Sequence, residues 1–330
     1  MNNNYLIHVI TDFGQDYNAG IIQHALSIFN ANSDNKSIEN INYIQYGAVK
    51  DFSIIDGSYK VLFACQNINP FTASSTTHGL LMVIDPTVGE SNRKKHRKPI
   101  AFRLKNGVFG VAPDNGVITK IAEKFGLEEA RYIDEKKIRK LSKLGNIKSS
   151  VWDGYYIYSA ALPIILKHKS LTPVCGYENI SDKIKTLALP KTKKLLDTNA
   201  YRCPISGIDK NGNITLDTNI FDIDSPLFIN SFDVFNDEEN GEDRTHLGRF
   251  YLRASYSPHK KLDKNGNSLI AVNNPCLSRN SRIELAASSK KLINILKKLH
   301  PEIKLKINAG ESLILKPNYL AYKNQELEGG

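Results

Sequence analysis

Near its start the chain reads Tyr5-Leu6-Ile7-His8-Val9-Ile10, and this mostly apolar run leads into Thr11-Asp12-Phe13-Gly14. A short apolar run that stops at a turn is typical of a strand buried on both faces of a sheet. After the turn the period changes, and apolar residues recur at the spacing of one helix face, at Ile21, Ile22, Ala25, Leu26 and Phe29. A buried strand followed at once by an amphipathic helix predicts the first unit of an α/β sheet.

The same alternation continues to about residue 125. Apolar runs bounded by turn residues predict further strands, over 41–49, 80–84, 100–104 and 108–112. The last two flank Asn106-Gly107 and therefore predict a hairpin. Helical spacing predicts helices around 54–62 and 117–125, the second one capped by Asp114 or Asn115. Together these elements predict a layered α/β domain in which helices cover a mostly parallel sheet.

The pattern changes between residues 181 and 200, where a lysine-rich stretch is interrupted by Pro190. A loss of periodicity of this kind is typical of a segment between domains. We therefore expect an N-terminal α/β domain over 1–185 and a second, smaller domain over 200–330.

The second domain contains short strand-like runs and turn residues. Asn-Gly pairs at 211–212 and 265–266 lie beside such runs, which predicts an all-β domain. Residues 211–243 contain nine Asp or Glu and no Lys or Arg. We expect the part near 221–243 to be an acidic insertion or a long loop.

The sequence carries a formal net charge of +10, from 44 Lys and Arg against 34 Asp and Glu. Half of the basic residues fall in four stretches, at 93–98, 136–148, 183–194 and 290–306. Nucleic-acid-binding modules add a helix-turn-helix, a zinc-ligand spacing or an aromatic strand motif to such clusters, and the sequence has none of these. We interpret the clusters as solvated faces and loops, and keep nucleic-acid binding as an alternative that rests on charge alone.

Other features of the sequence restrict the class of protein. No apolar run reaches the about 18 residues of a transmembrane helix, and the first residues lack a signal-peptide pattern. The eight histidines and four cysteines show no metal-ligand spacing, and the cysteines lie far apart. We expect a cytoplasmic protein with no membrane partner and no bound metal.

Three acidic residues follow predicted strands. Asp12 comes after the first strand, Asp85 after the strand over 80–84, and Asp114 after the hairpin. Ligands of open α/β sheets bind at the carboxyl ends of the strands. The sequence therefore predicts a small-molecule site at this edge.

Several segments carry a resemblance to a known family. The first half contains Thr11-Asp12-Phe13-Gly14, Asp85-Pro86-Thr87-Val88-Gly89 and Val111-Ala112-Pro113-Asp114-Asn115-Gly116. The second half contains residues 207–213, Thr218-Asn219-Ile220 and Ile283-Glu284-Leu285-Ala286. In this order the segments resemble the motifs of the S-adenosyl-L-methionine (SAM) hydroxide adenosyltransferases, which are SAM hydrolases related to the fluorinase and chlorinase.

The resemblance implies both an architecture and a reaction. The family combines an N-terminal α/β domain with a small C-terminal antiparallel β-barrel, and its members are typically homotrimers. They hydrolyse SAM to adenosine and L-methionine by attack of an activated water on ribose C5′. The family uses neither a metal nor a cofactor.

The resemblance also assigns substrate contacts. By its motifs, Asp12 gathers the ribose hydroxyls and Phe52 lies over the sugar. Tyr256 stacks on adenine, while Asn213 meets the adenine edge. Asp209 meets the methionine ammonium group.

The residues that activate water depart from the family pattern. Asp85 matches the catalytic Asp, and Arg97 is our choice for the catalytic arginine, with Arg93 as the alternative. Where the family has a histidine, this sequence has Asp153. A second carboxylate can still orient water, and the pair raises the pKa of one member. The alternatives are a catalytically impaired SAM- or adenosine-binding protein and, less favoured because the added negative charge repels halide, a SAM-dependent halogenase.

Overall fold

The structure is a computed structural model in which the chain forms two compact units, Met1–Ala188 and Leu189–Gly330. Each unit is described by itself. The described residues are 3–31, 39–46, 49, 53–68, 76–86, 98–142, 154–189, 191–195, 198–208, 212–218, 229–237, 244–253, 269–273, 282–287, 292–299, 309 and 311–319.

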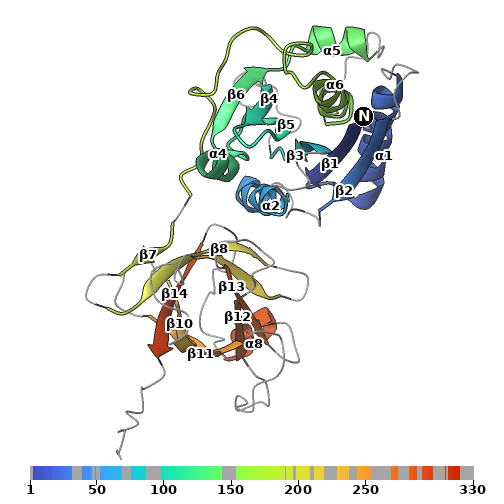
Figure 1. Ribbon diagram of the computed structural model, residues 1–330. Helices are drawn as coiled ribbons and strands as arrows, with labels where there is room; N and C mark the ends of the chain where they lie inside the picture. Colours follow the sequence, from blue (N-terminus) through green and yellow to red (C-terminus); the bar gives the residue numbers. More distant parts are fainter. Residues whose placement is uncertain are drawn as a thin grey trace, which may run out of the picture. The chain divides into compact units, whose positions relative to one another are not determined.

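The first unit is built on a six-stranded sheet with the order β2-β1-β3-β5-β4-β6 (Figure 1). Its strands are β1 (Asn3–Thr11), β2 (Glu39–Gln45), β3 (Thr76–Val83), β4 (Pro99–Leu104), β5 (Phe109–Pro113) and β6 (Leu127–Tyr132). The first four in spatial order are parallel, and β4 runs antiparallel between β5 and β6. The predicted mostly parallel sheet and the β4–β5 hairpin are confirmed.

Helices cover both faces of this sheet (Figure 1). They are α1 (Gln15–Ala31), α2 (Ile54–Gln66), α4 (Thr119–Phe125), α5 (Glu135–Leu141) and α6 (Ser159–His168), the last preceded by a π-helix, η1 (Gly154–Tyr158). Successive residues of β3 face opposite sides of the sheet and are buried on both: Leu81 packs with α1 and α6, and Leu80 packs with α2 and α4. Helix α6 approaches closely because Gly79 has no side chain, and a Cβ there would lie 2.9 Å from Leu166. The run over 80–84 is therefore buried on both faces of the sheet. The strand predicted over 41–49 corresponds to β2 at the edge of the sheet, where Tyr43 and Ile44 are exposed.

Helix α4 begins later than predicted, and neither proposed residue caps it. Its N-cap is Ile118, which makes no side-chain cap hydrogen bond. Gly116, at φ +94°, reverses the chain before the helix begins. Asn115 accepts from the Val117 amide and Asp114 accepts from the Lys185 amide, so both side chains are used in the turn.

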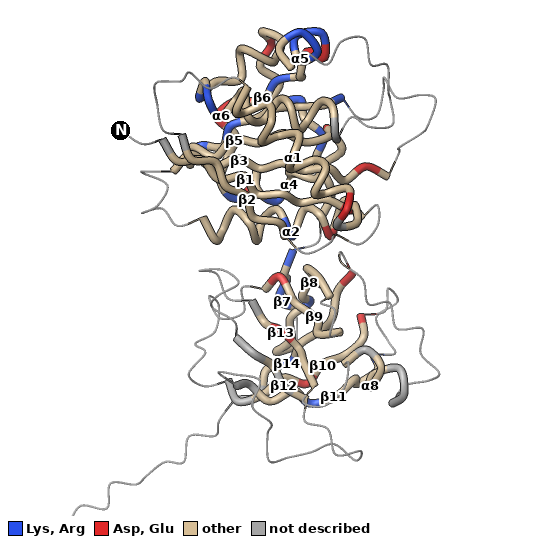
Figure 2. Tube along the Cα trace, turned by 90° about the vertical axis from the view of Figure 1, so that its right-hand side faces the viewer, with Lys and Arg blue, Asp and Glu red and all other residues tan. Residues whose placement is uncertain are grey.

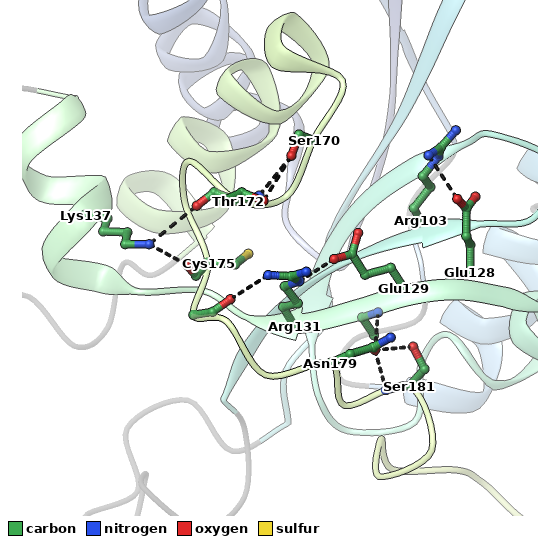
Figure 3. A network of polar contacts seen from close by, with 12 residues as sticks. Arg103, Glu128, Glu129, Arg131, Lys137, Ser170, Thr172, Cys175, Asn179 and Ser181 are labelled. Carbon is green, nitrogen blue, oxygen red and sulfur yellow. Dashed lines mark hydrogen bonds and ion pairs between the residues drawn. The ribbon is translucent and has the colours of Figure 1, made fainter.

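The chain after α6 is attached to β6 and α5 by polar contacts (Figure 3). Arg131 Nη1 donates to the Gly176 carbonyl at 3.2 Å, and Lys137 Nζ donates to the Cys175 carbonyl at 2.7 Å. Asn179 Oδ1 accepts from the Ala130 amide at 3.3 Å. The segment continues along the sheet to Leu187, whose amide donates to Thr119 Oγ1 at 2.9 Å.

The second unit is a mostly antiparallel β-barrel, as expected (Figure 1). Its strands are β7 (Lys193–Lys194), β8 (Tyr201–Ile208), β9 (Ile214–Asp217), β10 (Ile229–Asn236), β11 (His246–Arg253), β12 (Leu269–Asn273), β13 (Arg282–Ala287) and β14 (Ser312–Tyr319), and one helix is α8 (Leu292–Leu299). Pairing of β14 with both β10 and β8 closes the ring. Every described pair is antiparallel except β11 with β12.

Part of the acidic stretch is a barrel strand and not a loop. In β10, Phe232 and Val234 point into the core, whereas Asp233 lies outside and pairs with Arg249 at 2.7 Å. This apolar–polar alternation is the pattern of a half-buried strand. Residues 221–228 and 238–243 lie outside the described residues.

Most charged residues of the described chain are at least partly exposed, and Figure 2 marks their positions along the chain. On α5, Lys136 and Lys140 are exposed while Ile138 is fully buried, as on an amphipathic surface helix. In the described part of the chain, no helix has both the length and the apolar character needed to cross a membrane.

Candidate functional site

The carboxyl ends of β1, β3 and β5 form one continuous edge. The Asp12 amide donates to the Val83 carbonyl at 3.3 Å, which joins the turn after β1 to the end of β3. Asn115 Nδ2 donates to the Ile84 carbonyl at 2.8 Å, which joins β3 to the turn after β5. The edge predicted from the sequence is therefore present, with Asp12 and Asp85 on neighbouring turns.

The turn that carries Asp12 is held by a buried asparagine of α1. Thr11 Oγ1 donates to Asn18 Oδ1, and Asn18 Nδ2 donates to the Phe13 carbonyl at 3.2 Å. Asn18 is 3% exposed, and Asp12 itself is half-buried. Asn18 was not predicted from the sequence. It could have been found as a polar residue on the apolar face of the helix, because it precedes Ile21 by three positions and Ile22 by four.

Asp85 is buried at the end of β3, whereas the following Pro86 is exposed. A carboxylate in this position is shielded from bulk water but lies one residue from the surface. Such a group can accept a proton from a water molecule that enters the edge.

Asp114 holds the turn after β5 to two other segments of the first unit. Its Oδ1 accepts from the Lys185 amide at 2.8 Å, and its own amide donates to the Lys98 carbonyl at 3.0 Å. The Tyr132 hydroxyl is hydrogen-bonded to the Asp114 carboxylate. Burial and this negative charge raise the pKa of Tyr132. Asp114 thus has a structural role in the turn after β5, and Asp12 and Asp85 stay the acidic residues predicted to act on a ligand.

An aromatic pair lies beside Asp12. The rings of Phe13 and Tyr17 are 6.0 Å apart, and Tyr17 is 56% exposed at the start of α1. The sequence reading did not single out this pair. Exposed aromatic surface next to a binding edge is suited to contact with an apolar or aromatic ligand group.

A second polar cluster lies farther from the edge, on the α2 face of the sheet. His8 Nε2 is 3.0 Å from His78 Nδ1, and His8 Nδ1 is 3.0 Å from the Tyr46 hydroxyl. Burial and the neighbouring His78 lower the pKa of His8 to about 4, and burial lowers that of His78. The pair is neutral near pH 7 and lies within the sheet, so it is not part of the candidate site.

Asn213 lies in the second unit, half-buried and directly before β9. Six other predicted site residues lie outside the described residues: Phe52, Arg93, Arg97, Asp153, Asp209 and Tyr256. Their predicted roles stay predictions. Ser53, next to Phe52, is described: its side chain caps α2 by accepting from the Asp56 amide at 3.2 Å.

Metal and thiol chemistry find no support in the described residues. They contain no group of three or more His, Cys, Asp or Glu that could hold a metal ion. Burial raises the pKa of Cys175 and of Cys203 to about 12, and that of Cys65 also rises. These three thiols are neutral at physiological pH and therefore poor nucleophiles.

Comparison with solved structures supports the fold. An uncharacterized conserved protein from Thermotoga maritima has a TM-score of 0.66 at 18% identity, over 94% of this chain and 99% of that one. A conserved hypothetical protein from Thermus thermophilus has a TM-score of 0.55 at 15% identity, with the same coverage of both chains. At these identities the likeness concerns the fold alone.

Comparison of sequences identifies the family. An (R)-S-adenosyl-L-methionine hydrolase from Methanocaldococcus jannaschii is 30% identical over 213 residues, 63% of this chain. The matched part spans 65% of the length of that relative. Residues 7–174 match the model of the SAM hydroxide adenosyltransferase N-terminal domain. That match covers just over half of the 330 residues, includes the edge with Asp12 and Asp85, and shows that the chain belongs to the SAM hydroxide adenosyltransferase family.

Proposed function

We propose that this protein hydrolyses SAM to adenosine and L-methionine by attack of water on ribose C5′. The observation that carries the proposal is the hydrogen bond between the Asp12 amide and the Val83 carbonyl, which keeps two carboxylate turns side by side at the carboxyl edge. The family match and the relative named as an (R)-SAM hydrolase support the choice of substrate.

The reaction suits a site built from carboxylates. The sulfonium of SAM is a good leaving group, so no acid has to protonate it. Attack by a hydroxide-like nucleophile cancels charge in the transition state, and a site that excludes water favours this step once the nucleophile is aligned with C5′. In the proposed site the half-buried Asp12 binds the two ribose hydroxyls and fixes the position of C5′.

Asp85 is the proposed base. The support for this role is its burial at the end of β3, which shields the carboxylate from bulk water. By the resemblance, Arg97 (or Arg93) and Asp153 complete the group that orients this water. Phe52, Asp209, Asn213 and Tyr256 are proposed to bind the substrate, with no metal or cofactor, in a cytoplasmic homotrimer.

Product analysis in isotopically labelled water tests the proposal. Purified protein is incubated with SAM in water enriched in ¹⁸O, and the products are separated by chromatography and weighed by mass spectrometry. Attack at C5′ predicts adenosine that carries the label and methionine that does not. Both sulfonium epimers should be assayed, because the relative is named for the (R) form. If neither epimer yields adenosine, the hydrolase proposal fails.

The second candidate is a SAM- or adenosine-binding protein without turnover. It is favoured by one observation, Asp153 in the position of the family's histidine. Tight SAM binding in calorimetry without product formation would support it, and an Asp153→His variant should then gain hydrolysis. A parallel incubation with chloride separates hydrolysis from halogenation, which would yield 5′-chloro-5′-deoxyadenosine.

A further inference from the structure

The turn after β1 is held on both sides of Asp12 by one side chain. Asn18 accepts from Thr11 Oγ1 and donates to the Phe13 carbonyl at 3.2 Å. Thr11 and Asn18 are 2% and 3% exposed, so water does not compete for these bonds. With the residues on both sides fixed, the backbone of Asp12 has little freedom to shift.

The turn after β3 is held in a comparable way. Asn115 Nδ2 donates to the Ile84 carbonyl at 2.8 Å, and this carbonyl belongs to the peptide bond that leads into Asp85. Asn115 Oδ1 accepts from the Val117 amide at 3.1 Å, which fixes the asparagine itself within its own turn. Each carboxylate turn is thus bound by the side-chain amide of an asparagine, which comes from the following helix at Asp12 and from the turn after β5 at Asp85.

We propose that Asn18 and Asn115 are positioning residues, Asn18 for Asp12 and Asn115 for Asp85. The inference rests on the proposed function, because it assigns each asparagine to a different step. Asp12 is proposed to bind ribose, which SAM and adenosine share. Asp85 is proposed to activate water, which matters for turnover but not for adenosine binding.

The same substitution at both positions separates the two roles. Asn→Asp keeps the acceptor oxygen, which serves Thr11 Oγ1 at one site and the Val117 amide at the other. It replaces the donor NH₂ by an oxygen that faces a carbonyl. Asn18→Asp is expected to weaken adenosine binding about tenfold and to raise KM for SAM similarly. Asn115→Asp is expected to lower kcat about 10- to 100-fold and to leave adenosine binding unchanged, because a small displacement of a reacting group is costly.

Each variant is the control for the other, since both receive the same chemical change in the same fold. The pair Asn18→Ala and Asn115→Ala repeats the comparison without an added charge. The crossed pattern, with binding lost in one variant and kcat in the other, supports the proposal. A common loss of melting temperature with unchanged kinetics, or the same kinetic defect in both variants, overturns it.

Backbone amide exchange keeps the two proposals distinguishable. If the wild-type protein forms no adenosine from SAM, the proposed function fails, and exchange still decides the positioning roles. Faster exchange confined to 11–14 in Asn18→Asp and to the Ile84 and Asp85 amides in Asn115→Asp supports them. Unchanged exchange at both turns overturns them.

Discussion

Acid is expected to destabilise this protein through its buried histidine pair. His8 is 3% exposed and is held between the Tyr46 hydroxyl and His78. Burial, reinforced by the nearby His78, lowers the pKa of His8 from 6.5 to about 4. The unfolded chain therefore takes up a proton at a pH where the folded protein does not.

The direction and size of the change in the free energy of unfolding follow from this difference in pKa. Because the folded pKa is lower, the stability contributed by neutral His8 is complete above pH 6.5 and is lost as the pH falls from 6.5 to 4. A pKa difference of about 2.5 corresponds to about 3 kcal/mol in the free energy of unfolding. His78 adds to the loss, since burial lowers its pKa too. Burial raises the pKa of both Tyr46 and Cys65, so these groups stay neutral in this range.

Urea unfolding followed by circular dichroism at several pH values measures the effect. Between about pH 7 and pH 4.5, the wild-type protein should lose about 2 kcal/mol more stability than His8→Gln, which has no ring to protonate, and the rest of the difference should appear below pH 4.5. His168→Gln, at an exposed position of α6, is the matched control and should follow the wild type. Equal pH slopes for the wild type and His8→Gln would refute the reasoning.

Three further predictions concern single residues. Asp85→Asn keeps the shape of the proposed base without its charge and should lower kcat by at least about 100-fold, measured as adenosine formed from SAM. Gly116→Ala should lower the free energy of unfolding by about 1–3 kcal/mol more than Gly107→Ala. Both glycines have positive φ, but only at Gly116 would a Cβ lie 2.6 Å from Leu187; equal melting temperatures would contradict this. A thiol reagent should modify the buried Cys65, Cys175 and Cys203 only after unfolding. Rapid labelling of these cysteines in the native protein would count against their burial.

Local patterns were sufficient to predict much of the first unit. The run over 80–84 and the Asn-Gly hairpin encode their structure in adjacent residues, and both appear in β3 and in the β4–β5 pair. Helix α6 was not predicted, because it is buried nearly all round and contains Pro163, so it lacks a one-sided apolar period. Strand β6 was not predicted because it is rich in charged residues. Ion pairs to the neighbouring strand β4, such as Arg103–Glu128, stabilise these charges in the sheet.

The candidate site was predictable in part. Asp12 and Asp85 could be placed at one edge because the carboxyl ends of parallel strands meet there. Asn18 is hydrogen-bonded to nearby residues, Thr11 and Phe13, whereas the roles of Asn115 and Asp114 depend on contacts between residues far apart in sequence. For example, Asp114 pairs with the Lys185 amide, and no local pattern encodes that partner. Closure of the barrel by β14 and β8 is non-local for the same reason.

The attachment of residues 185–187 to the turn after β5 has a consequence for how the protein can be divided. The Lys185 and Leu187 amides bind Asp114 and Thr119, on either side of the position where Asn115 reaches Ile84. A fragment that ended at residue 180 would contain every strand of the first sheet and would still lose both bonds. The last residues before the second unit therefore belong to the scaffold of the candidate site, and a boundary drawn by sheet membership alone would cut through it.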